Sequence, residues 1–367
     1  MGPRTFGVEE ELLLVDPATG DVSGRGAAVA GHAGIDVELT QEQIEVQTAP
    51  HSEFADMRQD LLDQRRAARD AALAAGVAVA AMATCPMKVS PTTTRNDRYL
   101  RMAELYGLTA REQLTCGMHV HVAIDSPDEG VAVIDRIRPW LAVLLALSTN
   151  SPFSQGHDTG YASYRSRLWY RWPSAGPTPV FGSAQAYEEC VSSMVSCGAL
   201  LDRKMVYFDA RLAESYPTVE VRVADVCRTV DNAALVATLG RALVETAARS
   251  WQRGEPPPPV RVELLRLAAW RAARSGLAEN LVDVERAAPV KAMTMVGALV
   301  AHVADVLGEQ GELDAVRDTV DRMVREGTGS SRQRAAYERS GSLREVALDA
   351  VRATVGQDAQ HPRRPDR

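Results

Sequence analysis

Cysteine is scarce in this sequence. The 367 residues include five cysteines, an odd number, and no two of them form a Cys-x-x-Cys pair; they are Cys85, Cys116, Cys190, Cys197 and Cys227. The disulfide frameworks of secreted domains use even sets of cysteines. The pattern therefore favours a reduced, cytoplasmic protein.

Long apolar runs and an excess of positive charge are also missing. The longest strongly apolar stretch, residues 140–147, is far shorter than the ~20 residues that span a bilayer. The N-terminus lacks a basic segment followed by an apolar one, so we expect no signal peptide. A net charge of −7 argues against general binding to nucleic acids or anionic membranes. The expected partners are small molecules.

Several common cofactor and catalytic motifs are absent. No Gly-x-Gly-x-x-Gly follows a predicted strand, which disfavours a Rossmann cofactor site, and there is no Walker motif. No serine or cysteine near the polar segments has a base at a recognisable spacing; those considered are Ser163, Ser166, Cys116 and Cys227. The sequence thus offers no nucleophile–base pair.

Predicted strands fill the first part of the chain and helices the last. Strands are expected over 4–16, 35–48, 77–82, 115–124, 205–213 and 217–226. Helices are expected over 53–75, 128–149, 183–203, 231–253, 261–276, 289–308, 312–326 and 342–356. Residues 86–98 are predicted to be a loop. The long polar and aromatic connection over 150–183 is of the kind that usually carries function.

What stands out is a set of acids, histidines and an arginine at alternate positions of four predicted strands. Successive side chains of a strand point to opposite faces, so residues two apart share a face. The pairs are Glu9 and Glu11, Glu45 and Gln47, His119 and His121, and Glu220 and Arg222. A face of this kind is too costly to bury without partners. It is what a site for divalent metal ions and phosphate requires.

Clustered carboxylates indicate a hard cation such as Mg²⁺ or Mn²⁺, because like charges repel unless a cation lies between them. Two alternatives stay open at this level. Each glutamate, taken singly, is also compatible with a solvated position. His119 and His121 are compatible with a zinc hydrolase, although such a site needs more nitrogen or sulfur ligands, or with plain hydrogen bonding inside a sheet.

Arginines supply the candidates for binding phosphate. Arg222 shares a strand face with Glu220, and Arg165 lies in the aromatic connection. A guanidinium binds phosphate or carboxylate through two parallel hydrogen bonds. Arg332 follows a Gly/Ser stretch that either presents backbone N–H groups to a phosphate or is a plain loop between helices. We include Arg332 among the candidate cofactor-binding residues.

Five motifs together resemble the glutamate–cysteine ligase type 2 family, bacterial carboxylate–amine ligases, over roughly residues 4–340. They are Gly7-Val-Glu-Glu-Glu11, Gln43-Ile-Glu-Val-Gln-Thr-Ala-Pro50, Cys116-Gly-Met-His-Val-His-Val122, Asp158-Thr-Gly-Tyr-Ala-Ser-Tyr-Arg165 and Tyr216-Pro-Thr-Val-Glu-Val-Arg-Val-Ala-Asp225. The resemblance implies an α+β, glutamine synthetase-like catalytic fold, in which a curved, mainly antiparallel sheet forms a funnel with helices packed outside. We expect a single catalytic domain over 1–356, with sheet-forming motifs mainly in 4–226 and a helical part in 231–356. A disordered tail over 357–367 is expected to follow.

The resemblance also implies roles for particular residues. The implied metal ligands are Glu9, Glu11, Glu38, Glu45, His119 and Glu220. Arg222 and Arg165 are the implied arginines facing the phosphates, with ATP and Mg²⁺ (or Mn²⁺) as cofactors. His121 receives no role from the resemblance.

The implied activity is ATP-dependent formation of an amide between the γ-carboxylate of glutamate and an amine, by default cysteine, through an acyl phosphate. The amine itself is not identified by the sequence. Besides the zinc hydrolase, a relative that binds nucleotide without turnover is an alternative. A homo-oligomer is compatible with the apolar helices after residue 231, and so is packing of these helices on the sheet.

Overall fold

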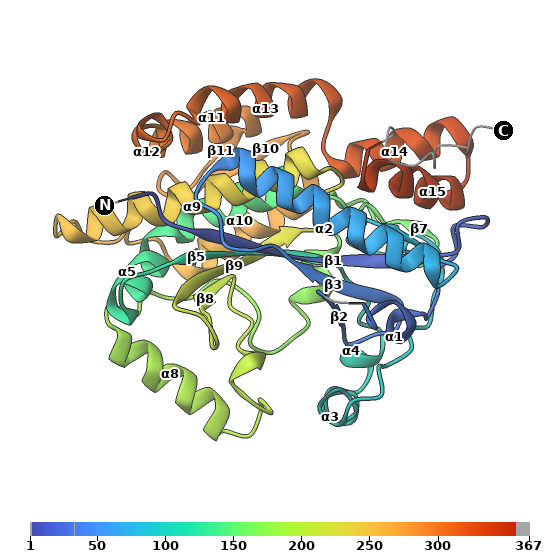
Figure 1. The fold of residues 1–367 in the computed structure, drawn as a ribbon. Helices are drawn as coiled ribbons and strands as arrows, with labels where there is room; N and C mark the ends of the chain where they lie inside the picture. Colours follow the sequence, from blue (N-terminus) through green and yellow to red (C-terminus); the bar gives the residue numbers. More distant parts are fainter. Residues whose placement is uncertain (1, 33, 357–367) are drawn as a thin grey trace.

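A curved sheet of seven strands organises the computed structural model, which describes residues 2–32 and 34–356 (Figure 1). The strand order is β2-β3-β1-β5-β9-β8, β4 pairs with β1, and every pairing in this sheet is antiparallel. Its strands are β1 (Phe6–Val15), β2 (Ile35–Val37), β3 (Gln43–Gln47), β4 (Ala78–Ala80), β5 (Gly117–Ala123), β8 (Ala210–Leu212) and β9 (Thr218–Asp225). Two small hairpins lie outside it: β6 (Phe153–Ser154) with β7 (His157–Asp158), and β10 (Asn280–Asp283) with β11 (Ala288–Lys291).

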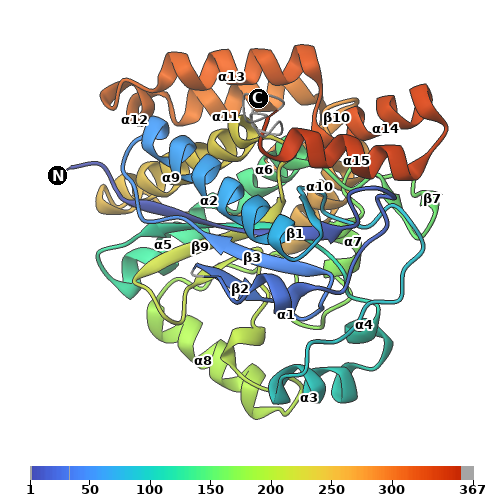
Figure 2. The same cartoon turned by 45° about the vertical axis from the view of Figure 1, so that its right-hand side comes forward.

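Helices cover one face of the sheet and flank the opening on the other. Those before β8 are α1 (Gly26–Val29), α2 (Phe54–Ala74), α3 (Asp97–Tyr106), α4 (Leu108–Arg111), α5 (Pro127–Ile137), α6 (Leu141–Ser148), α7 (Arg165–Trp169) and α8 (Ala184–Ser196). Those after β9 are α9 (Val230–Gln252), α10 (Val262–Ser275), α11 (Ala292–His302), α12 (Ala304–Glu309), α13 (Leu313–Glu326), α14 (Gly329–Ser340) and α15 (Leu343–Thr354). Helices α2, α9 and α13 lie above the sheet, whereas α3 and α8 lie below it (Figures 1 and 2). This arrangement confirms the predicted fold class.

The helix-covered face follows from the alternation of apolar residues along the strands. Phe6, Val8 and Leu12 of β1 are buried, as are Val120 and Val122 of β5. Helix α9 supplies much of the opposing surface, with fifteen of its residues buried. Its start is fixed by Thr229, whose side chain accepts a hydrogen bond from the N–H of Asn232. The core therefore lies between the sheet and the helices, and the other face of the sheet is left for polar side chains.

Several predicted boundaries are wrong, for identifiable reasons. The predicted helix 128–149 is two helices, α5 and α6, because Pro139 lies in a short 3₁₀ turn between them (η1, Arg138–Trp140). The extended segment 35–48 is interrupted between β2 and β3. Residues 289–308 begin in a β-hairpin, and α3 and α14 were not predicted. The other 3₁₀ turn, η2 (Arg203–Met205), lies at the end of the predicted helix 183–203, of which α8 is the helical part.

Two further expectations concern the chain as a whole. The predicted disordered tail, 357–367, lies outside the described residues. Across residues 2–32 and 34–356, no helix combines the length and the apolar character needed to cross a bilayer.

A buried ion pair fastens the sheet to the helices behind it. Glu10 of β1 points to the helix side, where Arg65 of α2 donates to both its oxygens at 2.6 and 2.7 Å. The same guanidinium donates to three carbonyl oxygens, those of Cys227, Arg228 and Thr354. Its side chain is 0% exposed. Arg65 thus joins β1, the end of β9 and the end of α15 through one side chain.

Removing this guanidinium should be strongly destabilising, because Glu10 would remain as an uncompensated buried charge. We expect Arg65→Ala to lower the free energy of unfolding by about 3–5 kcal/mol in denaturant titrations. The matched control is Arg66→Ala on the same helix, whose side chain is 43% exposed and pairs only with Asp63 among described residues; it should cost less than about 1 kcal/mol. Equal losses in the two variants would contradict a special role for Arg65.

Candidate active site

Strand β1 lies at the centre of the polar face, and its neighbours bring the other acids and histidines opposite it. Glu9 lies across from Gln47 on β3 and from His119 on β5. Glu11 lies across from Glu45 on β3. On the next pair of strands His121 faces Glu220. The shared face predicted from alternate positions is therefore present, and it belongs to a single sheet.

Arg222 lies in the same site, beside a bulge in β9. The register slips so that Arg222 and Val223 lie opposite the single residue His119. Bulges of this kind re-aim side chains next to functional sites. The Arg222 guanidinium reaches back to bond Glu220 of its own strand, and Arg211 of β8 donates to the same carboxylate at 2.7 Å. Glu220 is thus held by two arginines from adjacent strands.

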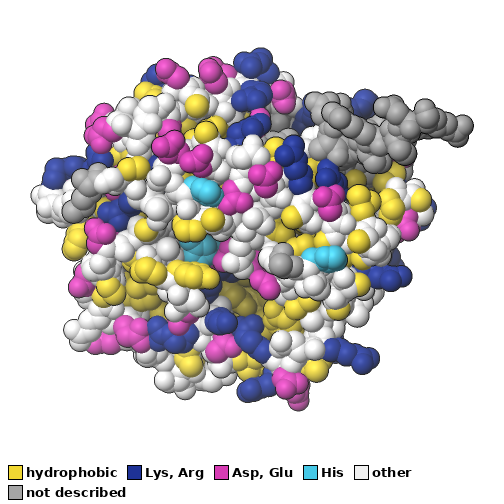
Figure 3. Space-filling model, in the orientation of Figure 1, with side chains coloured by type: hydrophobic (Ala, Val, Ile, Leu, Met, Phe, Trp, Pro, Cys, Tyr) yellow, Lys and Arg dark blue, Asp and Glu magenta, His cyan; other side chains and the backbone are white. Residues whose placement is uncertain are grey.

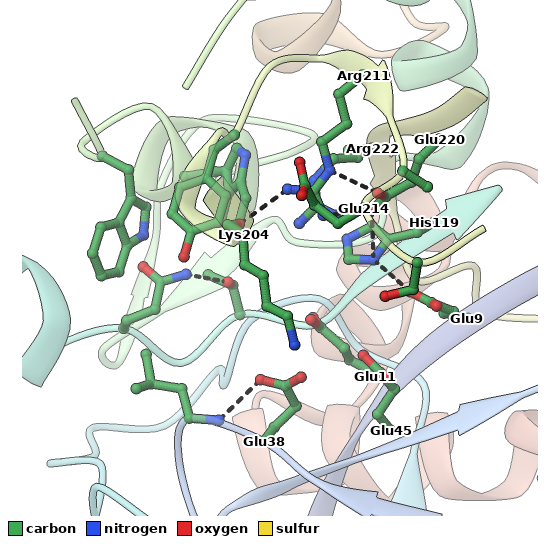
Figure 4. A pocket seen from close by; sticks show the side chains of 18 of the residues that line it. Glu9, Glu11, Glu38, Glu45, His119, Lys204, Arg211, Glu214, Glu220 and Arg222 are labelled. Atoms are coloured by element: carbon green, nitrogen blue, oxygen red, sulfur yellow. Dashed lines mark hydrogen bonds and ion pairs between the residues drawn. The ribbon is translucent and has the colours of Figure 1, made fainter. Parts of the chain in front are cut away.

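The polar face lines a pocket of about 320 Å³ between the sheet and the segments around α3 and η2 (Figure 4). The hollow is visible below the centre of the molecular surface, with charged side chains at its rim (Figure 3). Among the predicted residues, those that line it are Glu9, Glu11, Glu38, Glu45, His119, Glu220 and Arg222. His121, which had no predicted role, lines it as well.

The acids form two sets with ligand atoms close enough to hold a metal ion. One consists of Glu9, His121 and Glu220, with one ligand atom of each within 4.8 Å of the others. His119 adjoins this first set, with its Nδ1 3.3 Å from a Glu9 oxygen. The second set consists of Glu11, Glu38 and Glu45 and meets the same distance limit. The two sets are neighbours, because Glu9 and Glu11 are two residues apart on one strand.

Arg165 lies behind the pocket rather than on its wall. A Cβ on Gly117 would overlap the Arg165 guanidinium, so glycine is required there for the arginine to pass. Its loop is tied to β9 through Asp225, which accepts hydrogen bonds from Ser151 Oγ at 2.7 Å and Ser163 Oγ at 2.8 Å. Arg165, which was predicted to face the phosphates, is thus buried next to Glu11 and does not line the pocket. The Glu11 carboxylate accepts a hydrogen bond from the Gly117 N–H.

The indole of Trp169 lies between two of the candidate arginines. The Cζ atoms of Arg165 and Arg222 are each 5.5 Å from its ring centre. The Nε atoms of both guanidiniums are buried with no hydrogen-bond partner among the described residues. Cation–π attraction to the shared ring therefore helps to orient both cations, and Arg222 is held in addition by its bond to Glu220.

The structure places Arg332 elsewhere. It lies near the start of α14, lines a different hollow and is absent from the wall of the polar pocket. The predicted plain loop around it is also wrong, since Gly329–Ser340 is helical. The physical reason is local. Most of the Gly/Ser stretch forms the first turn of α14, and this helix lies on the side of the sheet opposite the pocket (Figure 1).

Sequence reasoning missed three cations of the pocket: Arg98 and Lys204, which face the sheet, and Arg211, which lies on strand β8 of the sheet itself. The Lys204 side chain points across the cavity toward Glu11 and Glu38 (Figure 4). Arg98 of α3 forms a paired ion bridge with Asp202, at 2.7 and 3.0 Å, which links α3 to the segment before η2. Only Arg211 had a readable signal, since it precedes the β8–β9 turn and pairs directly with Glu220.

Comparison with known proteins identifies the family. The model of "Glutamate-cysteine ligase family 2" matches residues 5–349. The chain belongs to glutamate–cysteine ligase family 2. A protein named "Putative glutamate--cysteine ligase 2-1" from Streptomyces avermitilis is 51% identical over 96% of this chain and 100% of its own length. Another, "Putative glutamate--cysteine ligase 2-2" from Frankia alni, is 51% identical over 96% and 98%.

Solved structures share the fold at low identity. A glutamate–cysteine ligase from Francisella tularensis, solved in complex with AMP, has a TM-score of 0.72 at 14% identity and covers 98% of this chain and 90% of that one. A bifunctional glutathione synthetase from Pasteurella multocida has a TM-score of 0.71 at 16% identity, covering 97% of this chain and 52% of that one. Both agree with the fold expected for the family.

Burial and crowding distort the pKa values of the pocket acids. Burial raises the pKa of Glu11 to about 7, and the nearby charge of Glu38 adds to this. Burial raises the pKa of Glu38, and burial with three neighbouring carboxylates raises that of Glu45. Conversely, burial and the charge of Arg222 lower the pKa of His119 to about 3, so this imidazole is neutral at physiological pH. Glu11, Glu38 and Glu45 thus ionise less readily than ordinary carboxyl groups. Raised pKa values are expected for a set of acids whose charges a bound cation would balance.

These features fit a divalent ion better than plain solvent. Oxygen ligands predominate in both sets, which suits Mg²⁺ or Mn²⁺. The neutral His119 ring has a buried Nε2 with no hydrogen-bond partner among the described residues. Its Nδ1 faces Glu9 and Glu220, and the unpartnered Nε2 is an acceptor or donor that a bound ion or ligand would satisfy.

The raised pKa values predict a characteristic pH dependence of stability. A carboxyl group whose pKa is higher in the folded protein stabilises it below the unfolded value of 4.5, and that contribution is lost as the pH rises through about 7. The free energy of unfolding of the metal-free protein should therefore fall between about pH 5 and pH 8. Added Mg²⁺ should restore it at the higher pH.

Glu11→Gln should reduce that fall by on the order of 1–3 kcal/mol, because a neutral amide replaces the titrating group. Denaturant titrations of the chelator-treated protein at a series of pH values measure it. Glu214→Gln is the control, since this glutamate lies at the rim and pairs with Arg203. An identical pH profile in Glu11→Gln and the unaltered protein would show that Glu11 does not carry the effect.

Proposed function

We propose that the protein is an ATP-dependent ligase that joins the γ-carboxylate of glutamate to an amine, with cysteine as the first candidate, through an acyl phosphate. One observation carries the proposal: two adjacent acid sets on one sheet face a wall of cations across a single pocket. Such a pocket suits a triphosphate bridged by divalent ions. The family supports the same class of reaction.

The residues present fit two divalent ions, Mg²⁺ or Mn²⁺. Glu9, Glu220 and the neighbouring histidines would hold one, and Glu11, Glu38 and Glu45 the other. Bound there, the ions would neutralise phosphate oxygens and so favour attack by an anionic carboxylate. The Francisella structure contains AMP, which supports use of an adenine nucleotide by a protein of this fold.

In the proposed reaction the chain positions the reactants and balances their charge. A γ-carboxylate oxygen attacks the terminal phosphorus of ATP, the bond to the bridging oxygen breaks, and ADP leaves. The amine nitrogen then attacks the acyl carbon, phosphate departs with the bonding electrons, and the amine releases its extra proton to water. Arg222, Arg211 and Lys204 lie where they would neutralise the oxygens that gain charge. No protein nucleophile is needed. Burial raises the pKa of the nearby Cys116 thiol well above its usual value, so this residue is poorly suited to that role.

A second pocket, of about 310 Å³, adjoins the first and differs in chemistry. Glu9, His121 and Tyr216 line both, so the two are neighbours across the first acid set. The rest of its wall consists of apolar residues, threonines, a glycine and one glutamine: Thr5, Phe6, Gly7, Val8, Gln47, Thr48, Pro50, Ala123, Pro217 and Thr218. We assign the flat purine base to this pocket and the amino acid substrates to the charged one.

A zinc hydrolase fits less well. Both acid sets are dominated by oxygen, and no cysteine belongs to either of them. Catalytic zinc sites use three protein ligands rich in nitrogen or sulfur. In addition, His119 and His121 both adjoin Glu9, which gives them a mixed environment with carboxylate neighbours.

The direct test is to measure ADP and phosphate release with panels of carboxylates and amines. We expect release that requires both glutamate and an amine, and a Glu9→Gln variant that loses activity by at least about a hundredfold, since loss of an oriented charge costs several kcal/mol. Nucleotide binding without turnover for any pair would support the inactive-relative alternative. Retention of normal, Mg²⁺-dependent activity by Glu9→Gln would exclude the proposed site.

A matched pair of alanines tests the assignment of the two pockets. Ala123 lines the apolar pocket and Ala213 the charged one, and both are half-buried. Ala123→Leu should raise the KM for ATP about tenfold or more by filling the base pocket, while the KM for glutamate changes little. Ala213→Leu should raise the KM for glutamate and change the KM for ATP little. The same KM shifting in both variants, measured by steady-state kinetics, would contradict the assignment.

A further inference from the structure

Arg332, which does not reach the polar pocket, lines a second charged hollow on the helix side of the molecule. This hollow has a volume of about 220 Å³ and lies where the start of α9, the end of α13, the start of α14 and the end of α15 meet. None of its lining residues lines the polar pocket. The charged ones are Arg228, Arg322, Arg332, Arg352, Asp231, Glu326 and Asp349.

Cations outnumber the acids around this hollow. Asp231 is shared by Arg322, at 2.7 Å, and Arg58, at 2.5 Å. Asp349 accepts from Arg228 at 2.7 Å and lies 3.7 Å from Arg352. Together with Arg58 there are five guanidiniums and three carboxylates, on a chain whose net charge is −7. The Arg332 side chain forms no ion pair within residues 2–32 and 34–356, so its charge is available to a ligand.

Arg228 provides the buried donor of the site. It is 6% exposed and lies three residues after the end of β9, in the short connection to α9. Its Nη2 donates to Asp349, whereas its Nη1 is buried with no partner among the described residues. A buried donor left unpaired is costly and therefore indicates a missing acceptor.

The start of α9 adds a further positive element. This helix spans 23 residues, and its first residues Thr229, Asp231 and Asn232 line the hollow. The N-terminus of a helix carries a partial positive charge and attracts anions. Burial lowers the pKa of Arg228, and the neighbouring charges of Arg332 and Arg352 act in the same direction. The ion pair with Asp349 opposes this shift, and Arg332 and Arg352 remain as like charges that a bound anion would offset.

We propose that this hollow binds the phosphate group of a small anion, with Arg228 as the buried donor and Arg332 and Arg352 closing over it. A guanidinium cluster at a helix N-terminus matches the tetrahedral, multiply charged oxygens of phosphate. The site is also connected to the sheet. The carbonyl of Arg228 accepts from Arg65, the partner of Glu10, and β9 carries Arg222 and Glu220 six and eight residues earlier. The proposal does not depend on the ligase activity.

Calorimetric titration of the full chain with inorganic phosphate, at constant ionic strength against chloride, tests the site. We expect phosphate to bind and the double variant Arg332→Gln/Arg352→Gln, in which both replaced side chains are exposed, to bind it at least tenfold more weakly. Arg334→Gln, on the same helix but paired with Asp158, should bind as the unaltered protein does. Glycerol 3-phosphate, titrated in parallel, separates a site for phosphorylated metabolites from one restricted to free phosphate.

The polar pocket is the competing location for phosphate, and Arg222→Gln separates the two. Binding that persists in Arg222→Gln and weakens in the double variant supports the proposal. Binding that disappears in Arg222→Gln but persists in the double variant would place phosphate in the polar pocket and overturn it. Absence of any phosphate binding by the unaltered protein would overturn it equally. Arg228→Lys, which keeps the charge but removes the second donor, should weaken binding without loss of the folded state.

Discussion

The alternation of side chains along strand β1 determines how the site and the core of this protein are arranged. Three successive glutamates of β1 point in turn to the pocket, to the helices and to the pocket again. Glu10, the middle glutamate, is stable in the interior only because Arg65 donates two hydrogen bonds to it. The remaining donors of Arg65 bond three carbonyl groups. With Glu10 fixed from behind, Glu9 and Glu11 have no freedom to turn away from each other.

On the pocket face of the sheet, this arrangement brings several carboxylates close together. Carboxylates crowded on one face raise one another's pKa values, and the surrounding arginines relieve only part of the repulsion. Glu220 is held by Arg211 and Arg222, which leaves Glu11, Glu38 and Glu45 as the less compensated set. This second set would therefore be stabilised by positive charge supplied from outside the chain, as the proposed function requires.

The sequence was most informative where function follows the two-residue period of a strand. Glu9, Glu11, Glu45, His119 and Glu220 were identified in this way and line one pocket. Glu38 lies outside a regular strand, so it was indicated by its place among the clustered acids and by the family resemblance, and not by the two-residue period. Arg98 and Lys204 were missed because they reach the pocket from segments whose approach is set by tertiary packing. Arg332 was misplaced for the opposite reason, since a Gly/Ser/Arg motif records a local preference for anions but not the side of the sheet on which it lies.

The bridge between Arg98 and Asp202 has a consequence for how such a scaffold diversifies. It joins two segments, around α3 and before η2, that contribute no strand to the sheet. The two segments are also joined by Tyr106, whose hydroxyl donates to the Ala199 carbonyl, and both contribute residues to the pocket wall. Substitutions in these segments would alter that wall without changing the acids of β1, which Arg65 anchors from the far side of the sheet. Proteins of this fold can in this way keep the same reaction and differ in substrate specificity.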